Sequence, residues 1–350
     1  MLVHFARLRR VAILIALSPS LLACSHLHLT QDPGVAIIRT GTYDQSPKAG
    51  PVAARVLPYA LIAEQSYNDD IYAGKPVVPH KRECIEDDPE GCDTATDQRR
   101  ADHWLNEWRY VWGCSGAGFG RGQCRLTDNV SPLVEGLGVQ VWVRRGPVCR
   151  EAIIAFRGTI PNSLGDWASN LHWITRNLPI YDQYDQVRDH IGDFIGHVTS
   201  DRCYREGITQ IATLGHSLGG GLAQLAAYED HRVRRVYAFD PSFVTGYYSV
   251  KLAERDNNRV GLRIERIYEH GEILAFARYL LRQFNPPTAC DPRIVNVRFH
   301  VLHGNIIYQH GITPLTSALL RAARNDVPER DPVIDQPCSV GGDGEGEARM

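Results

Sequence analysis

The chain has 350 residues, of which 43% are apolar and 22% are charged, and its formal net charge is −2. This apolar content excludes a chain that is disordered along its whole length. The near-neutral charge gives no reason to expect nucleic acid as a partner. The sequence holds no sustained run of about 18 apolar residues, so no ordinary membrane-spanning helix is expected. Nine cysteines make an odd count, which leaves one thiol to explain if the others form disulfides.

The N-terminal segment 1–23 has the pattern of a secretory signal peptide. Three arginines among the first ten residues precede the short apolar run Val11–Leu17, and Leu21-Leu22-Ala23-Cys24 follows. This last stretch resembles the lipobox of bacterial lipoproteins, and the alternative is an ordinary signal peptide with a chance cysteine. The resemblance implies that Cys24 is lipidated and anchors the protein in the cell envelope. Ser25, the next residue, favours the outer membrane.

The other eight cysteines form an even set, as expected in a compartment where disulfides persist. Proximity in sequence favours the pairs Cys84–Cys92 and Cys114–Cys124. Cys149 and Cys203 each precede an expected strand, which predicts that they lie close in space. No CxxC pair occurs, so metal binding by these cysteines is disfavoured.

The first part of the chain divides into three segments. Residues 24–54 contain Pro, Gly, Thr and Asp with little periodicity and are expected to tether the anchor to the fold. Residues 56–67 have apolar side chains at helical spacing. Residues 76–130 hold four cysteines, three tryptophans and a glycine cluster at 116–122. Because that cluster lacks the GxGxxG spacing, we expect a disulfide-braced insertion and no dinucleotide site.

From residue 138 onward, expected strands alternate with expected helices. This alternation predicts an α/β fold, a mostly parallel central sheet with helices on both faces. The domain is expected to span 55–324 and to be followed by a flexible acidic tail at 325–350. The expected strands are 139–143, 152–156, 208–214, 233–239, 262–268 and 294–301, and the expected helices are 183–199, 217–228, 272–284 and 314–324.

The strongest motif is Gly215-His216-Ser217-Leu218-Gly219, which follows an apolar strand and precedes an apolar helix. The G-x-S-x-G motif in this context predicts a tight turn that exposes a nucleophilic serine, Ser217, at the carboxyl edge of the sheet. Bulky side chains at Gly215 and Gly219 would clash with the neighbouring strand and helix. The backbone N–H of Leu218 is a candidate oxyanion donor because it opens the helix.

Further motifs make the resemblance specific. Ala155-Phe156-Arg157-Gly158-Thr159, then Asp166-Trp167 and Asn170-Leu171, precede Gly-His-Ser-Leu-Gly-Gly by about fifty residues. Over roughly residues 55–320 the chain resembles the class 3 lipases, which are α/β-hydrolases. The resemblance implies that Thr159 supplies the second oxyanion donor through its backbone N–H. It also implies a lid after Thr159, for which Trp167, Leu171 and Trp173 offer an apolar face, although packing of these side chains on the core is an equal alternative. The cysteine-rich insertion is not part of the family pattern.

An activated serine needs a histidine base, and in this fold the base follows the last strand. His310, in Tyr308-Gln309-His310-Gly311, is preferred because related hydrolases carry a Gln-His pair in this loop. His303, at the end of the strand, is the alternative base. His300 is expected inside the strand and buried. His300 and His303 also form a weak candidate metal pair, since residues three apart on a strand point to opposite faces.

The acid is expected after the preceding strand. Glu272 stands at the family position, where aspartate is usual, and its extra methylene changes its reach. Asp240, which ends an earlier strand, is the alternative acid, and Glu269 is a third candidate. Asp166 is expected to start a helix or to belong to the lid.

Together these residues predict a serine ester hydrolase that forms an acyl-enzyme and needs no cofactor and no metal. The resemblance and the expected anchor favour lipid esters, as for a lipase or phospholipase A held at a membrane. One alternative is a carboxylesterase or thioesterase that acts on soluble acyl esters. Another is a non-catalytic envelope lipoprotein that retains the fold.

Overall fold

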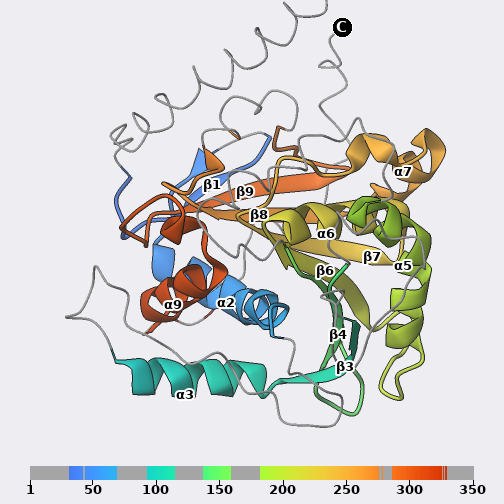
Figure 1. Ribbon diagram of the computed structural model, residues 1–350, viewed down its shortest axis with the longest axis horizontal. Helices are drawn as coiled ribbons and strands as arrows, with labels where there is room; N and C mark the ends of the chain where they lie inside the picture. Colours follow the sequence, from blue (N-terminus) through green and yellow to red (C-terminus); the bar gives the residue numbers. More distant parts are fainter. Residues whose placement is uncertain are drawn as a thin grey trace, which may run out of the picture.

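The computed structural model describes residues 31–41, 44–68, 93–114, 137–158, 182–275, 278, 286–324, 326 and 328. Its nine-stranded sheet has the order β2-β1-β9-β8-β7-β6-β5-β4-β3 (Figure 1). Strands β5 to β9 are parallel to one another, and the strands that flank them on either side run antiparallel. The strands are β1 (Ile37–Arg39), β2 (Asp44–Gln45), β3 (Trp108–Cys114), β4 (Val139–Arg144), β5 (Glu151–Phe156), β6 (Gln210–His216), β7 (Val233–Phe239), β8 (Arg263–Glu269) and β9 (Arg293–Phe299).

Helices cover both faces of this sheet (Figure 1). On one face lie α2 (Ala49–Gln65), α3 (Thr94–Leu105) and α9 (Ile312–Ala322). On the other lie α5 (Gln183–Thr199) and α6 (Leu218–Glu229), with the short helix α7 (Leu252–Asn258) beside α6. The mostly parallel α/β architecture predicted from the alternation of elements is therefore confirmed.

Two apolar layers follow from the period of two along each strand. In β5, Ile153 and Ala155 pack toward α2 and α9, whereas Ile154 and Phe156 pack toward α5 and α6. All of these side chains are fully buried. A strand buried on both faces must be apolar throughout, which explains the continuous apolar run in the sequence.

The register aligns the carboxyl ends of the parallel strands. Phe156 pairs with Gly215, His216 with Phe239, and Glu269 with Phe299. The loops that follow these strands therefore open at one edge of the sheet, where ligands bind in open α/β folds.

The N-terminal part of the fold differs from expectation. The segment 24–54, expected as a tether, contains β1 and β2 and the start of α2. The segment 76–130, expected as an insertion, contains α3 and the edge strand β3, which pairs with β4. Strand β1 is stabilised by hydrogen bonds to a distant partner, β9, and local sequence carries little signal of that pairing. Helix α3 does carry a local signal, because the side chain of Asp93 accepts from the N–H of Thr96 at its start.

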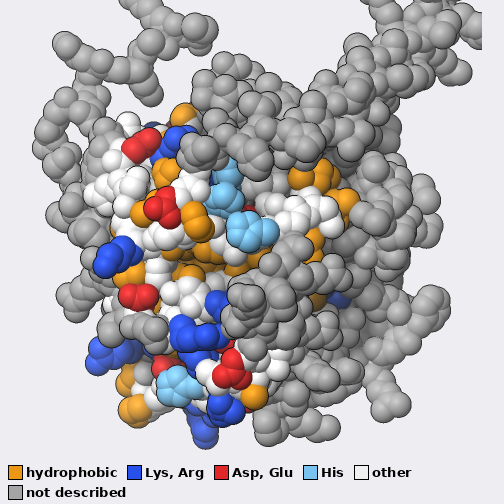
Figure 2. Space-filling view, turned by 90° about the vertical axis from the view of Figure 1, so that its left-hand side faces the viewer, with side chains coloured by type: hydrophobic (Ala, Val, Ile, Leu, Met, Phe, Trp, Pro, Cys, Tyr) orange, Lys and Arg blue, Asp and Glu red, His pale blue; other side chains and the backbone are white. Residues whose placement is uncertain are grey.

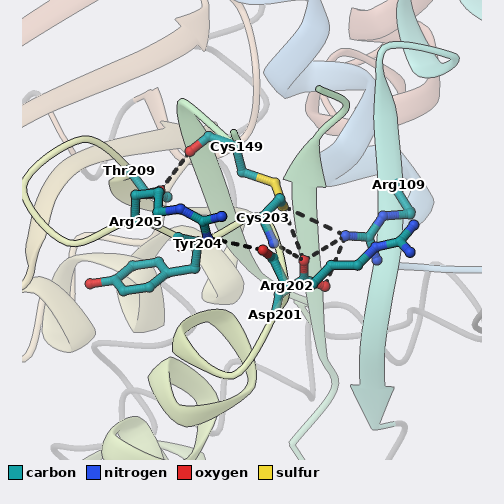
Figure 3. Close-up of a disulfide and its surroundings, with 8 residues drawn as sticks. All are labelled: Arg109, Cys149, Asp201, Arg202, Cys203, Tyr204, Arg205 and Thr209. Atoms are coloured by element: carbon teal, nitrogen blue, oxygen red, sulfur yellow. Dashed lines mark hydrogen bonds and ion pairs between the residues drawn. A yellow bond between two sulfur atoms is a disulfide. The ribbon is translucent and has the colours of Figure 1, made fainter. Parts of the chain in front are cut away.

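A disulfide joins Cys149 to Cys203, as their predicted proximity suggested (Figure 3). The bond lies at the amino end of β5. The N–H of Cys149 also donates to the carbonyl of Cys203 at 3.0 Å, and the hydroxyl of Thr209 donates to the carbonyl of Cys149 at 2.6 Å. Arg109 pairs with Asp201 at 2.7 Å beside it, which ties β3 to the same corner. Cys114 forms a disulfide as well, and so does Cys290, each with a cysteine other than Cys149 and Cys203.

Several predictions concern residues outside the described part of the chain. They include the signal 1–23, Cys24, the lid residues, Thr159, the pair Cys84–Cys92 and the partner proposed for Cys114, Cys124. Most of the expected helix 272–284 and of the tail 325–350 also lies outside it. Among the helices that the structure describes, none is both long and apolar enough to span a bilayer.

Replacing both cysteines in a Cys149→Ala/Cys203→Ala variant should lower the free energy of unfolding. The bond closes a loop with a sequence separation of 54 residues. The chain-entropy estimate for a loop of that length is about 4 kcal/mol. Urea unfolding followed by circular dichroism measures the loss, and a change below about 1 kcal/mol contradicts a stabilising role. The native spectrum in the absence of urea serves as the control for folding.

Candidate active site

The turn between β6 and α6 holds Ser217 in a strained conformation. Its φ is 57° and its ψ is −122°, a region that residues with a Cβ rarely adopt. The N–H of Ser217 donates to the carbonyl of Phe239 at 2.9 Å, and the N–H of Ser242 donates to the carbonyl of Ser217 at 3.0 Å. These two bonds hold the turn against the neighbouring strand, so the serine hydroxyl stands at the carboxyl edge of the sheet.

Two close backbone approaches make the turn possible. A Cβ at Gly219 would stand 2.2 Å from the carbonyl oxygen of Phe156, and a Cβ at Gly215 would stand 2.4 Å from Gly219. No side chain fits at either distance. The clash expected from the motif is therefore present, and it explains why both positions are glycine.

Three predicted residues form one hydrogen-bond chain. His310 Nε2 lies 3.0 Å from Ser217 Oγ, and His310 Nδ1 lies 2.6 Å from Glu272 Oε2. The side chains of His310 and Glu272 are almost completely buried, while Ser217 is half-buried. The nucleophile, base and acid come from the loops after β6, β9 and β8. This arrangement is the one required for serine activation.

The alternative bases lie elsewhere. The sequence predicts His300 inside the last strand, but β9 ends at Phe299, and the Nδ1 of His300 lies 2.8 Å from the carbonyl of Gln31. His303 is exposed in the following loop. Both histidines lie beyond the strand, and their rings are 5.7 Å apart, so they do not point to opposite faces of β9 as predicted. Figure 2 shows histidine side chains gathered on the side of the molecule where β9 ends.

The alternative acids are buried beside the triad. Asp240 Oδ1 accepts from the N–H of Glu269 at 2.9 Å, and its Oδ2 has no hydrogen-bond partner among the described residues. Burial raises the pKa of Asp240 to about 7 and the pKa of Glu269 to about 8. Glu269 accepts from the backbone N–H of Val301 at 3.1 Å. Neither carboxylate is hydrogen-bonded to His310, so the acid that the geometry offers the base is Glu272.

Arg278 is a site residue that the sequence reasoning missed. It forms an ion pair with Glu272, and its Nη1 donates to the carbonyl of Pro241 at 2.6 Å. Its guanidinium lies 4.8 Å from the ring centre of Tyr268. Arg278 therefore joins the loops after β7 and β8. No motif marks it, because it stands six residues after Glu272 in an apolar segment.

The site is electrostatically set for a neutral base. Burial, together with the nearby charge of Arg278, lowers the pKa of His310 to about 3. An imidazole with a lowered pKa is unprotonated at neutral pH, which leaves Nε2 as an acceptor for the serine hydroxyl. The carboxylate of Glu272 at Nδ1 stabilises the imidazolium that forms when the proton moves.

His216, Asp240 and His310 offer ligand atoms within 4.8 Å of one another. His310 uses both ring nitrogens on Glu272 and Ser217. His216 uses both of its own on Tyr67 and the carbonyl of His310. The ring nitrogens of both histidines are thus engaged in hydrogen bonds with other groups of the site.

The oxyanion donors are described only in part. Leu218 is the first residue of α6, so its N–H has no acceptor within the helix. Thr159 lies outside the described residues, but Gly158, directly before it, is packed against Ser217.

No protein-family model and no curated protein matches the sequence. Solved structures with a similar fold include lipase II from Rhizopus niveus, with 14% identity, a TM-score of 0.31, and coverage of 71% of this chain and 79% of that one. A hyperthermophilic esterase from the archaeon Pyrobaculum calidifontis matches at 12% identity and a TM-score of 0.35, covering 88% and 95% of the two chains. The thermophilic carboxylesterase EstE1, cloned from a metagenomic library, matches at 12% identity and a TM-score of 0.31, covering 62% and 89%.

At these identities and scores, the activities of the three proteins do not transfer to this chain. The fold follows from the chain's own topology. A mostly parallel sheet with a strand–serine–helix turn after β6, and with loops after β8 and β9 that meet it, is the α/β-hydrolase fold.

The two acids with raised pKa values predict a pH dependence of stability. In an unfolded chain such groups titrate near pH 4. Between about pH 4 and pH 8 the folded protein therefore binds more protons than the unfolded chain, and the free energy of unfolding falls as pH rises. An Asp240→Asn variant keeps the Oδ1 acceptor but cannot ionise. The unfolding free energy of the variant minus that of the wild type should be larger at pH 8 than at pH 5. The change in this difference should be on the order of 2 kcal/mol. Denaturant unfolding at both pH values measures it, and a difference that does not change with pH contradicts the burial of this charge.

Proposed function

We propose that this protein is a serine ester hydrolase that acts on lipid esters while held at a membrane by its own N-terminal lipid anchor. The observation that carries the proposal is the hydrogen-bond chain from Ser217 Oγ through His310 to Glu272, built on a strained turn at the carboxyl edge of the sheet. A non-catalytic scaffold has no need of a strained serine that is hydrogen-bonded to a buried histidine.

The proposed reaction has two acyl-transfer steps. His310 Nε2 takes the proton of Ser217 while Oγ attacks the ester carbonyl. Glu272 accepts a hydrogen bond from the Nδ1–H of the resulting imidazolium. The N–H groups of Leu218 and Thr159 hold the oxyanion, each worth about 10²–10³ in turnover. His310 then gives its proton to the leaving alcohol. A water molecule, activated by the same base, releases the acyl group as an acid and restores Ser217.

Support for a lipid substrate comes from the sequence. The motifs around Thr159 and Ser217 resemble those of class 3 lipases, and the stretch that ends at Cys24 resembles a lipobox. Lipidation at Cys24 would hold the enzyme beside bilayer lipids. Ser25, the residue after this cysteine, favours the outer membrane as the place of attachment. A single lipid chain gives only marginal attachment, so bacterial-type anchoring at Cys24 requires more than one acyl chain.

A fluorophosphonate probe should label the purified wild-type protein at Ser217 and leave a Ser217→Ala variant unlabelled. The probe phosphonylates only a serine that is activated by a base. Intact-protein and peptide mass spectrometry identify the modified residue. Absence of labelling in a wild-type protein with a native circular dichroism spectrum would refute the enzymatic proposal.

Turnover of the same protein separates the two substrate classes. With a short-chain triglyceride, a rise in rate above the solubility limit supports action on lipid aggregates. A rate that saturates below the limit favours the alternative, a carboxylesterase or thioesterase on soluble acyl esters.

Replacement of the acid should separate Glu272 from its buried neighbour. A Glu272→Gln variant removes the carboxylate that orients the His310 ring, and kcat should fall by about 10³- to 10⁴-fold. Asp240→Asn, which changes a carboxylate that does not contact His310 Nδ1, should lower kcat less than about tenfold. Steady-state hydrolysis of p-nitrophenyl butyrate measures both. A larger loss in Asp240→Asn than in Glu272→Gln reverses the assignment.

A further inference from the structure

Two aromatic residues beside the triad have no role in the proposed reaction. Tyr67 follows the end of α2, and His216 is the residue before the nucleophile. Tyr67 Oη lies 2.9 Å from His216 Nδ1, and His216 Nε2 lies 2.7 Å from the carbonyl oxygen of His310. The hydroxyl of Tyr67 also accepts from the backbone N–H of Gly158 at 3.2 Å. Four groups that are distant in sequence therefore form one continuous chain.

The chemistry of the groups sets the direction of this chain. The carbonyl of His310 can only accept, so the proton of the His216 ring is on Nε2. Nδ1 of that neutral ring is then an acceptor, and the hydroxyl of Tyr67 must donate to it. The oxygen of Tyr67 retains a lone pair for the N–H of Gly158. Every donor has one acceptor, and no member can reverse without breaking the bonds on both sides.

The environment keeps the chain neutral. Burial raises the pKa of Tyr67, and burial together with His310 lowers the pKa of His216 well below its ordinary value. Both side chains are therefore uncharged over the ordinary pH range, and the same hydrogen bonds persist across it. Leaving a buried donor or acceptor without a partner costs about 1–3 kcal/mol, so the chain resists rearrangement.

The two ends of the chain are the parts of the site whose positions matter most. One end is the backbone of the base, His310. The other is Gly158, directly before the predicted oxyanion donor Thr159. There is no free space at that end, because a Cβ at Gly158 would stand 2.5 Å from the carbonyl of His216 and 2.6 Å from the hydroxyl of Tyr67.

We propose that Tyr67 and His216 are positioning residues that fix the backbone of His310 relative to the backbone of Gly158, the residue before the predicted oxyanion donor Thr159. This inference rests on the proposed ester hydrolysis and deepens it. Neither side chain touches the reacting atoms. Their effect is to hold the base and the oxyanion donor at one separation, since a displacement of about 1 Å between such groups costs about 10²-fold in rate.

The chain offers a matched control for a test. Tyr59 is a partly buried tyrosine on α2, whereas Tyr67 lies two residues beyond that helix. The hydroxyl of Tyr59 donates to Glu151 at 2.9 Å. Glu151 begins β5, at the amino edge of the sheet, whereas Tyr67 contacts the carboxyl edge. Tyr59→Phe and Tyr67→Phe each remove one hydroxyl from the same helix and its border, but only the second breaks the proposed chain.

For soluble p-nitrophenyl butyrate we expect Tyr67→Phe to lower kcat about 10- to 100-fold with KM changed less than threefold. Tyr59→Phe should leave kcat within twofold of the wild type. Thermal unfolding of both variants shows whether their losses of stability are similar. Nitrogen-15 spectra of the histidine rings give a second readout, because the Nδ1 signal of His216 should move toward the value of an unbonded acceptor in Tyr67→Phe alone.

The outcomes separate the two proposals. If the wild type is active and both tyrosine variants keep its kcat, the positioning role is overturned and ester hydrolysis stands. An inactive wild type overturns ester hydrolysis and with it the positioning role, whereas the nitrogen-15 spectra still decide whether the hydrogen-bond chain exists. A fall of kcat in Tyr67→Phe that is matched by Tyr59→Phe reduces the effect to general stability and also overturns the positioning role.

Discussion

The site depends on one constraint, the backbone turn at Ser217. With φ at 57°, Ser217 is the single residue that connects β6 to α6. The glycines at 215 and 219 allow the backbone of this turn to lie directly against Phe156. Such a conformation costs on the order of 1–3 kcal/mol and persists only when its surroundings over-determine it. The surroundings here are the backbone bonds to Phe239 and Ser242 and the apolar layers on both faces of the sheet. The rest of the site is arranged around the hydroxyl that this turn exposes.

An ion pair with Arg278 distinguishes the carboxyl group that serves the base. Three acids, Asp240, Glu269 and Glu272, lie within or beside the loops at the carboxyl edge, and each is almost fully buried. A buried charge is tolerated only with a partner. Glu272 has the cation of Arg278, whereas burial raises the pKa values of the other two toward neutrality. The pairing with Arg278 therefore distinguishes the carboxylate that orients His310 from two neighbours of similar burial.

The sequence predicted the elements whose signal is local and missed those whose signal is not. Helix α5 spans 183–199 as predicted, because Asp182 caps it and its apolar residues recur at helical spacing. The positions of Ser217, Glu272 and His310 followed from a motif, a chain order and a resemblance, and the structure brings the three together. Strands β1 and β3 were missed because non-local pairing stabilises them. Helix α3 was missed although Asp93 caps it, because the segment around it was interpreted from its cysteines as an insertion. Arg278 and the link from Tyr67 to His216 were missed because no spacing in the sequence marks a contact between distant loops.

The position of His310 has a consequence for the biogenesis of the protein. The nucleophile, the acid and the base are contributed in that order along the chain, and the base comes from the loop after the last strand. During synthesis, a chain that has already formed the turn at Ser217 still lacks its base. Strand β9 lies between β8 and β1, and the loop that carries His310 follows it. A chain that ends before His310 therefore holds a serine without its base, and reactivity at Ser217 reports that the loop after β9 is in place.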